Sequence, residues 1–293
     1  MSRLALGTAQ FGPNYGITNE SGELSDEAVV GMLRVAQEAG VSLFDTAADY
    51  GASQHRLGKF ARTGGGQSYI TKFSLPVDGI EPTAENIYLA SMAQLCVENL
   101  HGLLFHKLSD LKDERCGKAI EVLREARSNG VVTRIGVSVY GEEGLVDALE
   151  AFPDLDILQL PANVLDFRLL ESQAVSRLRD RGTEIHVRSV FLQGLLLATP
   201  DALPDYFEGL RPALQSLHQQ AVEQNISVLA LTLGIMRHHP SIDAVIVGAT
   251  SVPELESITQ SWLSATIRPR LNVLSAPAEL LDPRNWPSGR PIS

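Results

Sequence analysis

The chain has 293 residues, of which 44% are hydrophobic and 20% charged, and its formal net charge is −11 at pH 7. This length is ordinary for one (β/α)8 barrel, and so large an apolar share argues against a disordered chain. The negative charge argues against nucleic acid or an anionic membrane as the main partner, because both attract basic surfaces.

The sequence carries no clear targeting signal. No apolar run reaches the roughly 18 residues of a membrane span. The start, MSRLALGTAQFG, lacks the basic segment and longer apolar core of a signal peptide. The two cysteines, Cys96 and Cys116, have no metal-ligand spacing and are expected to be reduced thiols. These features favour a cytoplasmic protein without a metal ion.

Eight short, mostly apolar runs are predicted as strands. In chain order they cover residues 3–7, 41–47, 68–74, 100–106, 133–139, 155–161, 184–190 and 243–249. Near-continuous apolar character is typical of parallel strands that are covered by helices.

Amphipathic segments lie between these runs and are predicted as helices. The segment 24–40 has Ser25 as an N-cap candidate and Gly40 as a stop. Residues 109–130 and 250–265 repeat the pattern, and two more helical segments, near 209–224 and 227–239, precede the last strand.

The alternation predicts an α/β fold, a single TIM barrel over residues 1–293, with a tail from about 266 to 293 near the barrel mouth. A doubly wound sheet is the competing architecture. It would require a Gly-x-Gly-x-x-Gly turn after an early strand, and the sequence has none.

Polar side chains fall at the carboxyl ends of the predicted strands, where barrels carry their chemistry. The second strand ends near Asp45, and Tyr50 follows in the next loop; the third strand supplies Lys72 and the fourth His106. Each residue alone is more often a cap, a packing group or a solvated charge. The four on consecutive strands favour one catalytic site.

The chemistry follows from these residue types. Lys72 lies in an apolar run, where its charge needs a partner, and Asp45 is the natural one. A phenol has a pKa of about 10, and a neighbouring ammonium is expected to lower that of Tyr50. Such a site would deliver a proton to a carbonyl oxygen, with His106 orienting that oxygen.

These residues resemble the aldo-keto reductase superfamily. The resemblance runs through LALGTAQFGPNYGI (4–17), FDTAADYGAS (44–53), TKFS (71–74), LLFH (103–106), RIGVS (134–138), LQLPAN (158–163) and IVGATSVPELE (246–256). It implies a metal-free, nicotinamide-dependent oxidoreductase that reduces an aldehyde or ketone to an alcohol, or runs in reverse. It also implies that Tyr50 is the general acid/base, helped by Lys72, Asp45 and His106.

The resemblance further implies a set of cofactor contacts. Ser138 and Gln159 would bind the nicotinamide carboxamide, and Arg188 would stack on its ring. The loop after the seventh strand would lie along the pyrophosphate, and the start of the last helix would suit a phosphate. The remaining contacts are expected from Thr8, Ala9, Asp45, Ser189, Val190, Phe191, Gln193, Gly194, Gly248, Thr250 and Glu254.

Departures from the family pattern affect the choice of cofactor. Val139 replaces a common asparagine, Gly248 and Ala249 replace Lys-Ser, and Ile258 replaces an adenine-contacting asparagine. Glu254 stands where an arginine often meets the 2′-phosphate, which a carboxylate would repel. NADP(H) is favoured over NAD(H) as the family default, and NAD(H) stays open.

Two other functions stay open: a non-catalytic NADP(H)-sensing subunit, and a Schiff-base lyase that uses Lys72 as nucleophile. For a reductase, the substrate is expected to be a small aldehyde, ketone or sugar. Residues 191–209 and 280–293 are expected to shape its pocket, with Tyr15, Tyr140 and Trp286 as candidate walls. No oligomeric state is predicted.

Overall fold

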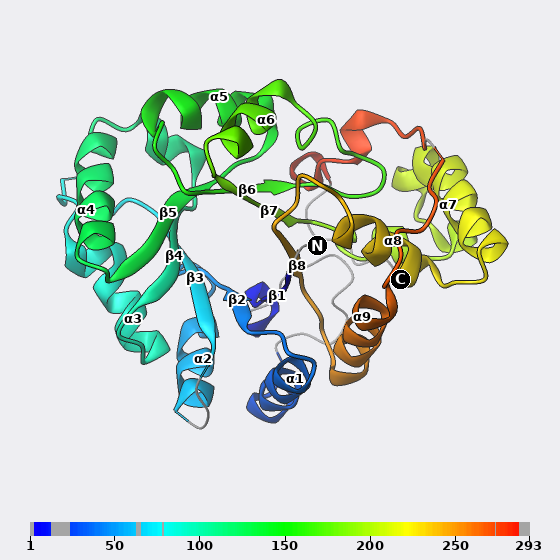
Figure 1. Ribbon diagram of the computed structural model, residues 1–293, viewed down its shortest axis with the longest axis horizontal. Coiled ribbons are helices and arrows are strands. Elements are labelled where there is room, and N and C mark those ends of the chain that lie inside the picture. The colour runs from blue at the N-terminus through cyan, green and yellow to red at the C-terminus, as the bar shows by residue number, and fades with distance from the viewer. Residues whose placement is uncertain (1–2, 13–23, 63–65, 78, 273, 287–293) are drawn as a thin grey trace.

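The protein forms a closed barrel of eight parallel strands, which helices surround (Figure 1). The computed structural model describes residues 3–12, 24–62, 66–77, 79–272 and 274–286. Each strand pairs with the next along the chain, and β8 closes the ring against β1. The TIM barrel predicted from the sequence is confirmed.

All eight predicted strands are present, and most agree with the predicted bounds to within one or two residues. The second is shorter than predicted, although the chain keeps two further bonds to β3, from Thr46 N to Ile70 O and from Ala48 N to Lys72 O. The strands are β1 (Arg3–Gly7), β2 (Leu43–Asp45), β3 (Ser68–Phe73), β4 (Leu100–Phe105), β5 (Val132–Ser138), β6 (Ile157–Pro161), β7 (Glu184–Arg188) and β8 (Ala244–Val247).

Serine caps begin several of the helices, as the sequence predicts for Ser25, whose side chain accepts from Ala28 N. The predicted helix 109–130 is divided, because the Asp113 carboxylate accepts from Arg115 N and ends a 3-10 turn there. The α-helices are α1 (Asp26–Glu38), α2 (Ser53–Ala61), α3 (Ala90–Leu95), α4 (Cys116–Ser128), α5 (Gly141–Ala151), α6 (Gln173–Asp180), α7 (Arg211–Glu223), α8 (Val228–Arg237) and α9 (Val252–Ser264).

The barrel interior is filled by a small apolar cluster, separate from the larger core between strands and helices. Its members are Ala5, Leu43, Ile70, Leu104, Ile157, Ala244 and Ile246. Because side chains along a strand alternate, the residue two positions later points the same way. The apolar cluster therefore sets which side chains stand above it at the carboxyl ends of the strands.

At the start of β7, at the opposite end of the barrel from the carboxyl ends of the strands, Glu184 contacts two arginines and a histidine. It accepts hydrogen bonds from Arg3 (3.1 Å) and His186 Nε2 (3.0 Å), and it lies 3.2 Å from Arg134 Nε. His186 is completely buried, and burial lowers its pKa despite the opposing charge of Glu184. The ring is therefore held in its neutral form.

This burial predicts a pH dependence of stability. Below about pH 6.5, the usual pKa of histidine, the unfolded chain binds a proton that folded His186 refuses, so the free energy of unfolding falls as the pH drops. His186→Gln keeps an N–H for Glu184 and is expected to flatten this fall. The slope should not vanish, because the pKa values of His106 and His239 are also lowered. Urea unfolding at several pH values measures it, and equal slopes for both proteins would contradict the prediction.

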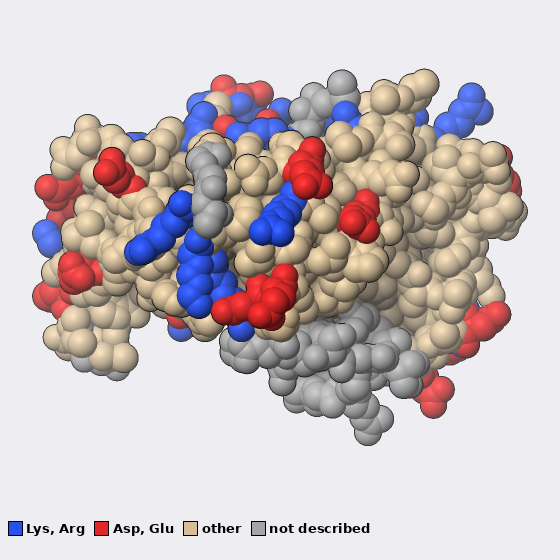
Figure 2. Space-filling view, turned by 90° about the horizontal axis from the view of Figure 1, so that it is seen from below, with Lys and Arg blue, Asp and Glu red and all other residues tan. Residues whose placement is uncertain are grey.

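Charges of both signs share the surface. Asp26 of α1 pairs with Arg56 and Lys59 of α2. On the face seen in Figure 2, most of the surface is neither acidic nor basic, and a group of blue side chains lies beside red ones near its centre. Within the described ranges, no helix has the length and apolar character needed to cross a bilayer.

Candidate active site

Three consecutive strands bring the predicted catalytic side chains to one part of the barrel rim. Asp45 and Lys72 each follow an interior apolar residue by two positions, Leu43 and Ile70 respectively. His106 stands in the same relation to Leu104, one residue beyond β4. The alternation of strand side chains thus directs all three above the apolar interior.

Lys72 and Asp45 form a buried ion pair. The Lys72 side chain is 1% exposed, and its Nζ donates to Asp45 Oδ1 at 2.5 Å and to the carbonyl of Thr46 at 3.0 Å. Asp45 Oδ2 accepts from Gln159 Nε2 at 2.8 Å. A buried charge pair is tolerated only when its remaining polar atoms are also bonded, and these contacts meet that condition.

Tyr50 lies beside this pair. Lys72 Nζ is 5.2 Å from the centre of the Tyr50 ring. The loop holding Tyr50 turns tightly, with hydrogen bonds from Tyr50 N to Ala47 O and from Ser53 N to Tyr50 O. Gly12 packs directly on the Tyr50 carbonyl, and any larger residue at position 12 would collide with it.

The pKa of Tyr50 differs from the sequence-based expectation. Burial raises the pKa of the phenol well above its usual value, and the negative charge of Asp45 raises it further. The positive charge of Arg188 opposes this rise without cancelling it. The expectation of a net lowering rested on one neighbouring charge and left burial out. The phenol therefore keeps its proton at neutral pH.

His106 lies edge-on to Tyr50, with ring centres 5.5 Å apart and planes at 81°. Burial and the charge of Lys72 lower its pKa, while the Asp49 carboxylate opposes them. Asp49 Oδ2 is 3.2 Å from His106 Nδ1. Sequence reasoning missed Asp49, although its position directly before Tyr50 was a usable signal.

The residues expected at the nicotinamide carboxamide bond to one another. Ser138 Oγ donates to Gln159 Oε1 at 3.2 Å, and Gln159 in turn donates to Asp45. Arg188 Nη2 donates to the Val139 carbonyl at 2.9 Å. The central guanidinium carbon of Arg188, Cζ, lies 3.7 Å from the centre of the Tyr140 ring. Tyr140 thus contacts the site through Arg188.

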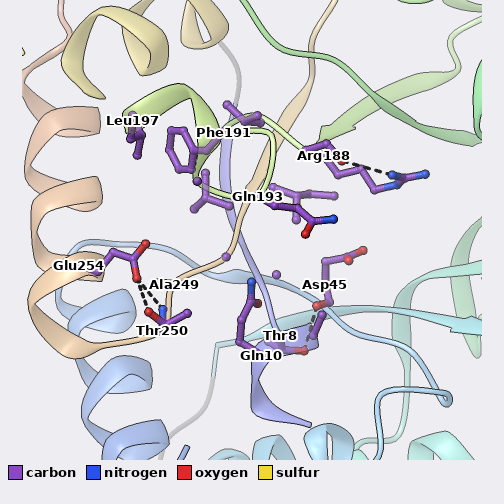
Figure 3. Close-up of a pocket in the computed structure, with 18 of the residues that line it drawn as sticks. Thr8, Gln10, Asp45, Arg188, Phe191, Gln193, Leu197, Ala249, Thr250 and Glu254 are labelled. Atoms are coloured by element: carbon purple, nitrogen blue, oxygen red, sulfur yellow. Dashed lines mark hydrogen bonds between the residues drawn. The ribbon is translucent and has the colours of Figure 1, made fainter. Parts of the chain in front are cut away.

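A cleft runs from this rim toward α9 (Figure 3). Tyr50 and most of the predicted cofactor-binding residues line it, whereas Lys72, His106, Ser138 and Gln159 do not. Gln10 and Leu197 also line the cleft and were not predicted from the sequence. The side-chain amide of Gln10 packs against Gly248, and a Cβ atom at position 248 would come too close to this amide. The predicted lining residues are Thr8, Ala9, Asp45, Arg188, Ser189, Val190, Phe191, Gln193, Gly194, Gly248, Thr250 and Glu254.

Thr8 fixes the inner end of the cleft, because its N–H and its hydroxyl both donate to the Asp45 main-chain carbonyl.

The outer wall of the cleft is formed by the loop after β7. Ser189, Leu192, Gln193 and Gly194 there have φ angles of 60°, 49°, 54° and 90°. Left-handed backbone at non-glycine residues costs of order 1–3 kcal/mol each and gathers at ligand-binding segments. The loop therefore stores backbone strain where it borders the cleft.

The far end of the cleft carries a negative charge. Glu254 Oε2 accepts from Thr250 N at 2.6 Å and from the Thr250 hydroxyl at 2.9 Å (Figure 3). Ser251, the N-cap of α9, accepts from Glu254 N at 3.3 Å. The Glu254 carboxylate thus occupies the end of the cleft nearest α9.

Two aromatic residues that were expected to line the substrate pocket, Tyr140 and Trp286, are not among the residues that line this cleft. Tyr140 lies between Arg188 and Arg284, whose guanidinium is 4.8 Å from the ring centre. Trp286 is buried against Phe207 and donates from its indole to Leu280 O. Tyr15 lies outside the described residues, as do residues 287–293 of the tail.

Within the described ranges, the structure contains no group of three or more His, Cys, Asp or Glu side chains that could hold a metal ion.

Comparisons with known proteins agree on the family. The model of the aldo/keto reductase family matches residues 3–268. A structure from Pseudomonas aeruginosa, assigned as a putative aldo-keto reductase, is 20% identical, covers 90% of each chain and has a TM-score of 0.64. The glycerol dehydrogenase of Gluconobacter oxydans is also 20% identical, covers 89% of this chain and 86% of its own, and has a TM-score of 0.69. At such identities these structures establish a shared fold. A search of curated proteins gave no match. Because the family model spans most of the chain, the protein belongs to the aldo/keto reductase family.

Proposed function

We propose that the protein is an NAD(P)H-dependent reductase that converts an aldehyde or ketone to an alcohol, or catalyses the reverse reaction. Membership in the aldo/keto reductase family supports an oxidoreductase. The observation that carries the finer proposal is the buried Lys72–Asp45 pair, with Lys72 Nζ 5.2 Å from the Tyr50 ring centre.

In this proposal Tyr50 is the general acid in reduction and the general base in oxidation. Its raised pKa keeps the phenol protonated, which is the form that donates. Donation leaves a phenolate, which Lys72 and Arg188 stabilise by their positive charges. Asp45 holds the Lys72 ammonium in place, so this stabilisation needs no rearrangement during the reaction.

The cleft beside Tyr50 is the proposed cofactor site. A bound nicotinamide would supply the hydride for the carbonyl carbon. Ser138 and Gln159 are proposed to hold the carboxamide, Arg188 to pack on the ring, and the loop 189–194 to clamp the phosphates. NADP(H) is proposed ahead of NAD(H) from the family default, and Glu254 is expected to weaken that preference.

Removing the charge of Glu254 is therefore expected to change cofactor affinity. Glu254→Gln keeps an acceptor for Thr250, and Glu254→Arg adds a positive charge. The arginine variant should bind NADPH about tenfold more tightly, about 1.4 kcal/mol, and the glutamine variant less than that. NADH affinity should change little. Fluorescence titration with both cofactors measures this, with Glu256→Gln, on the exposed side of α9, as control. NADPH affinity equal to wild type in both variants would exclude Glu254 from the 2′-phosphate site.

The two alternatives predict different behaviour. A Schiff-base lyase needs a neutral Lys72, and its contacts with Asp45 and the Thr46 carbonyl favour the ammonium. An NADP(H)-sensing subunit would bind the cofactor in the same cleft without turnover. Oxidation of NADPH in the presence of a generic aldehyde, such as a nitrobenzaldehyde, supports the reductase. Cofactor binding without turnover across aldehydes, ketones and sugars would favour the sensor.

The proposed substrate is a small aldehyde, ketone or sugar. The glycerol dehydrogenase among the structural neighbours supports a small polyhydroxy compound as one test substrate. A panel of aldehydes, ketones and aldoses, run with NADPH and NADH, is the experiment that tests this choice.

A further inference from the structure

We infer that Asp49 is a positioning residue for His106: it fixes which ring nitrogen carries the proton and so sets the pH dependence of each reaction direction. This inference rests on the proposed function for its kinetic part. Its structural part, the state of the imidazole, concerns the protein without any ligand.

The geometry around Asp49 brings three strand ends together. Asp49 lies in the loop after β2, Ser74 follows β3, and His106 follows β4. Asp49 Oδ2 accepts from Ser74 Oγ at 2.7 Å and lies 3.2 Å from His106 Nδ1. Lys107 Nζ is 3.8 Å from the same oxygen. The carboxylate is thus held by Ser74 and faces the imidazole.

The neighbouring turn fixes this arrangement relative to the phenol. Asp49 directly precedes Tyr50, and the hydrogen bond from Tyr50 N to Ala47 O tightens the loop that carries both. The His106 ring lies edge-on to Tyr50 while its Nδ1 meets Asp49. One short segment therefore supplies the proposed acid and the group that orients its neighbouring imidazole.

An ionised carboxylate only accepts hydrogen bonds, so the nitrogen that faces it must carry hydrogen. In neutral His106 this is Nδ1, and Nε2 is left as a lone-pair acceptor. Such a ring accepts a hydrogen bond from an alcohol but cannot donate one to a carbonyl. Protonated His106 has hydrogen on both nitrogens and donates from Nε2. The alcohol is therefore bound best by the neutral ring, and the carbonyl by the imidazolium.

Several charged groups act on the equilibrium between the neutral and the protonated imidazole of His106. Lys72 and burial favour the neutral ring, and Asp49 and Asp45 favour the imidazolium. Lys107 lies close to Asp49 and reduces its effect. Without Asp49, the balance shifts further toward the neutral ring, and the preference for the Nδ1–H tautomer is lost.

The first test reads the imidazole directly in the cofactor-free protein. Side-chain ¹⁵N NMR distinguishes Nδ1–H from Nε2–H, and the absence of its signal in His106→Gln assigns the residue among the seven histidines. Wild type is expected to be Nδ1–H when neutral, and Asp49→Ala to gain Nε2–H. Asp49→Asn, which keeps an acceptor oxygen, should retain more Nδ1–H than alanine. Asp147→Ala, which removes a distant ion pair with Lys112, serves as control and should match wild type.

The second test is the pH profile of kcat/KM in both directions. Reduction is expected to rise, and oxidation to fall, as the pH drops through the pKa of His106. In Asp49→Ala the neutral ring gains Nε2–H, which also donates to a carbonyl, so reduction should depend much less on pH across this range than in wild type. Cofactor affinity should stay within about twofold of wild type.

The outcomes separate the two proposals. An Nε2–H tautomer in wild type, or an unchanged imidazole in Asp49→Ala, overturns the role of Asp49 whatever the activity. The expected tautomers in a protein that turns over no carbonyl leave the Asp49–His106 pair standing and refute the proposed function. Wild-type profiles of reduction and oxidation that both rise, or both fall, as the pH drops through the pKa of His106 overturn the direction dependence.

Discussion

Replacing Tyr50 with phenylalanine is expected to lower kcat by about two to four orders of magnitude, the usual contribution of a general acid. The ring remains, so packing against His106 and the cleft wall should be kept. Only the hydroxyl that gives the proton is lost. The dissociation constant of the cofactor should change little, because the loop and strand-end contacts are untouched.

Steady-state kinetics with a nitrobenzaldehyde, beside fluorescence titration of NADPH, measures both quantities. Tyr206→Phe is a matched control, since that phenol donates to the Asn285 carbonyl far along the chain and is partly exposed. A Tyr50→Phe protein with wild-type kcat would remove Tyr50 from the acid role. A lost affinity for NADPH would instead assign Tyr50 to cofactor binding.

Replacing Lys72 with methionine is expected to affect both activity and stability. Asp45 would lose its counter-ion while buried, with Gln159 as its remaining side-chain donor. Breaking a buried pair by removing one partner costs about 3–5 kcal/mol. Turnover should fall by at least about a hundredfold, because the phenolate of Tyr50 would form beside an uncompensated carboxylate.

Urea unfolding at neutral pH measures the stability, and kcat measures the activity. The double variant Lys72→Met/Asp45→Asn removes both charges and is expected to recover part of the stability but not the turnover. This difference separates folding from chemistry. Lys72→Met with wild-type kinetics would contradict the proposed site, and an unchanged free energy of unfolding would show that the pair is not needed for the core.

The barrel was predictable because its signals are local. Eight apolar runs with helical segments between them leave few alternatives to a closed parallel barrel, and the alternation of strand side chains carries Asp45 and Lys72 to one rim. The division of helix 109–130 was harder to foresee. It depends on the Asp113 side chain competing for Arg115 N, which a hydrophobic pattern does not report.

The electrostatics of the site were less predictable, since they depend on residues far apart in the sequence. The sequence suggested that Lys72 lowers the pKa of Tyr50, but the degree of burial, which raises it, is set by packing from many segments. Gln159 reaches Asp45 from the opposite side of the barrel, and Glu254 takes up the Thr250 N–H. A family pattern names such positions without giving their bonds.

The most direct test of the central proposal, that Tyr50 protonates the oxygen as hydride reaches the carbon, is a pair of isotope effects on one turnover. Reduction of a nitrobenzaldehyde is timed in H₂O and in D₂O, each with unlabelled and with deuterated NADPH. Transfer in a single step predicts that both substitutions slow the reaction and that the solvent effect persists with the deuterated cofactor. A cofactor isotope effect without any solvent effect on the same step would contradict the account.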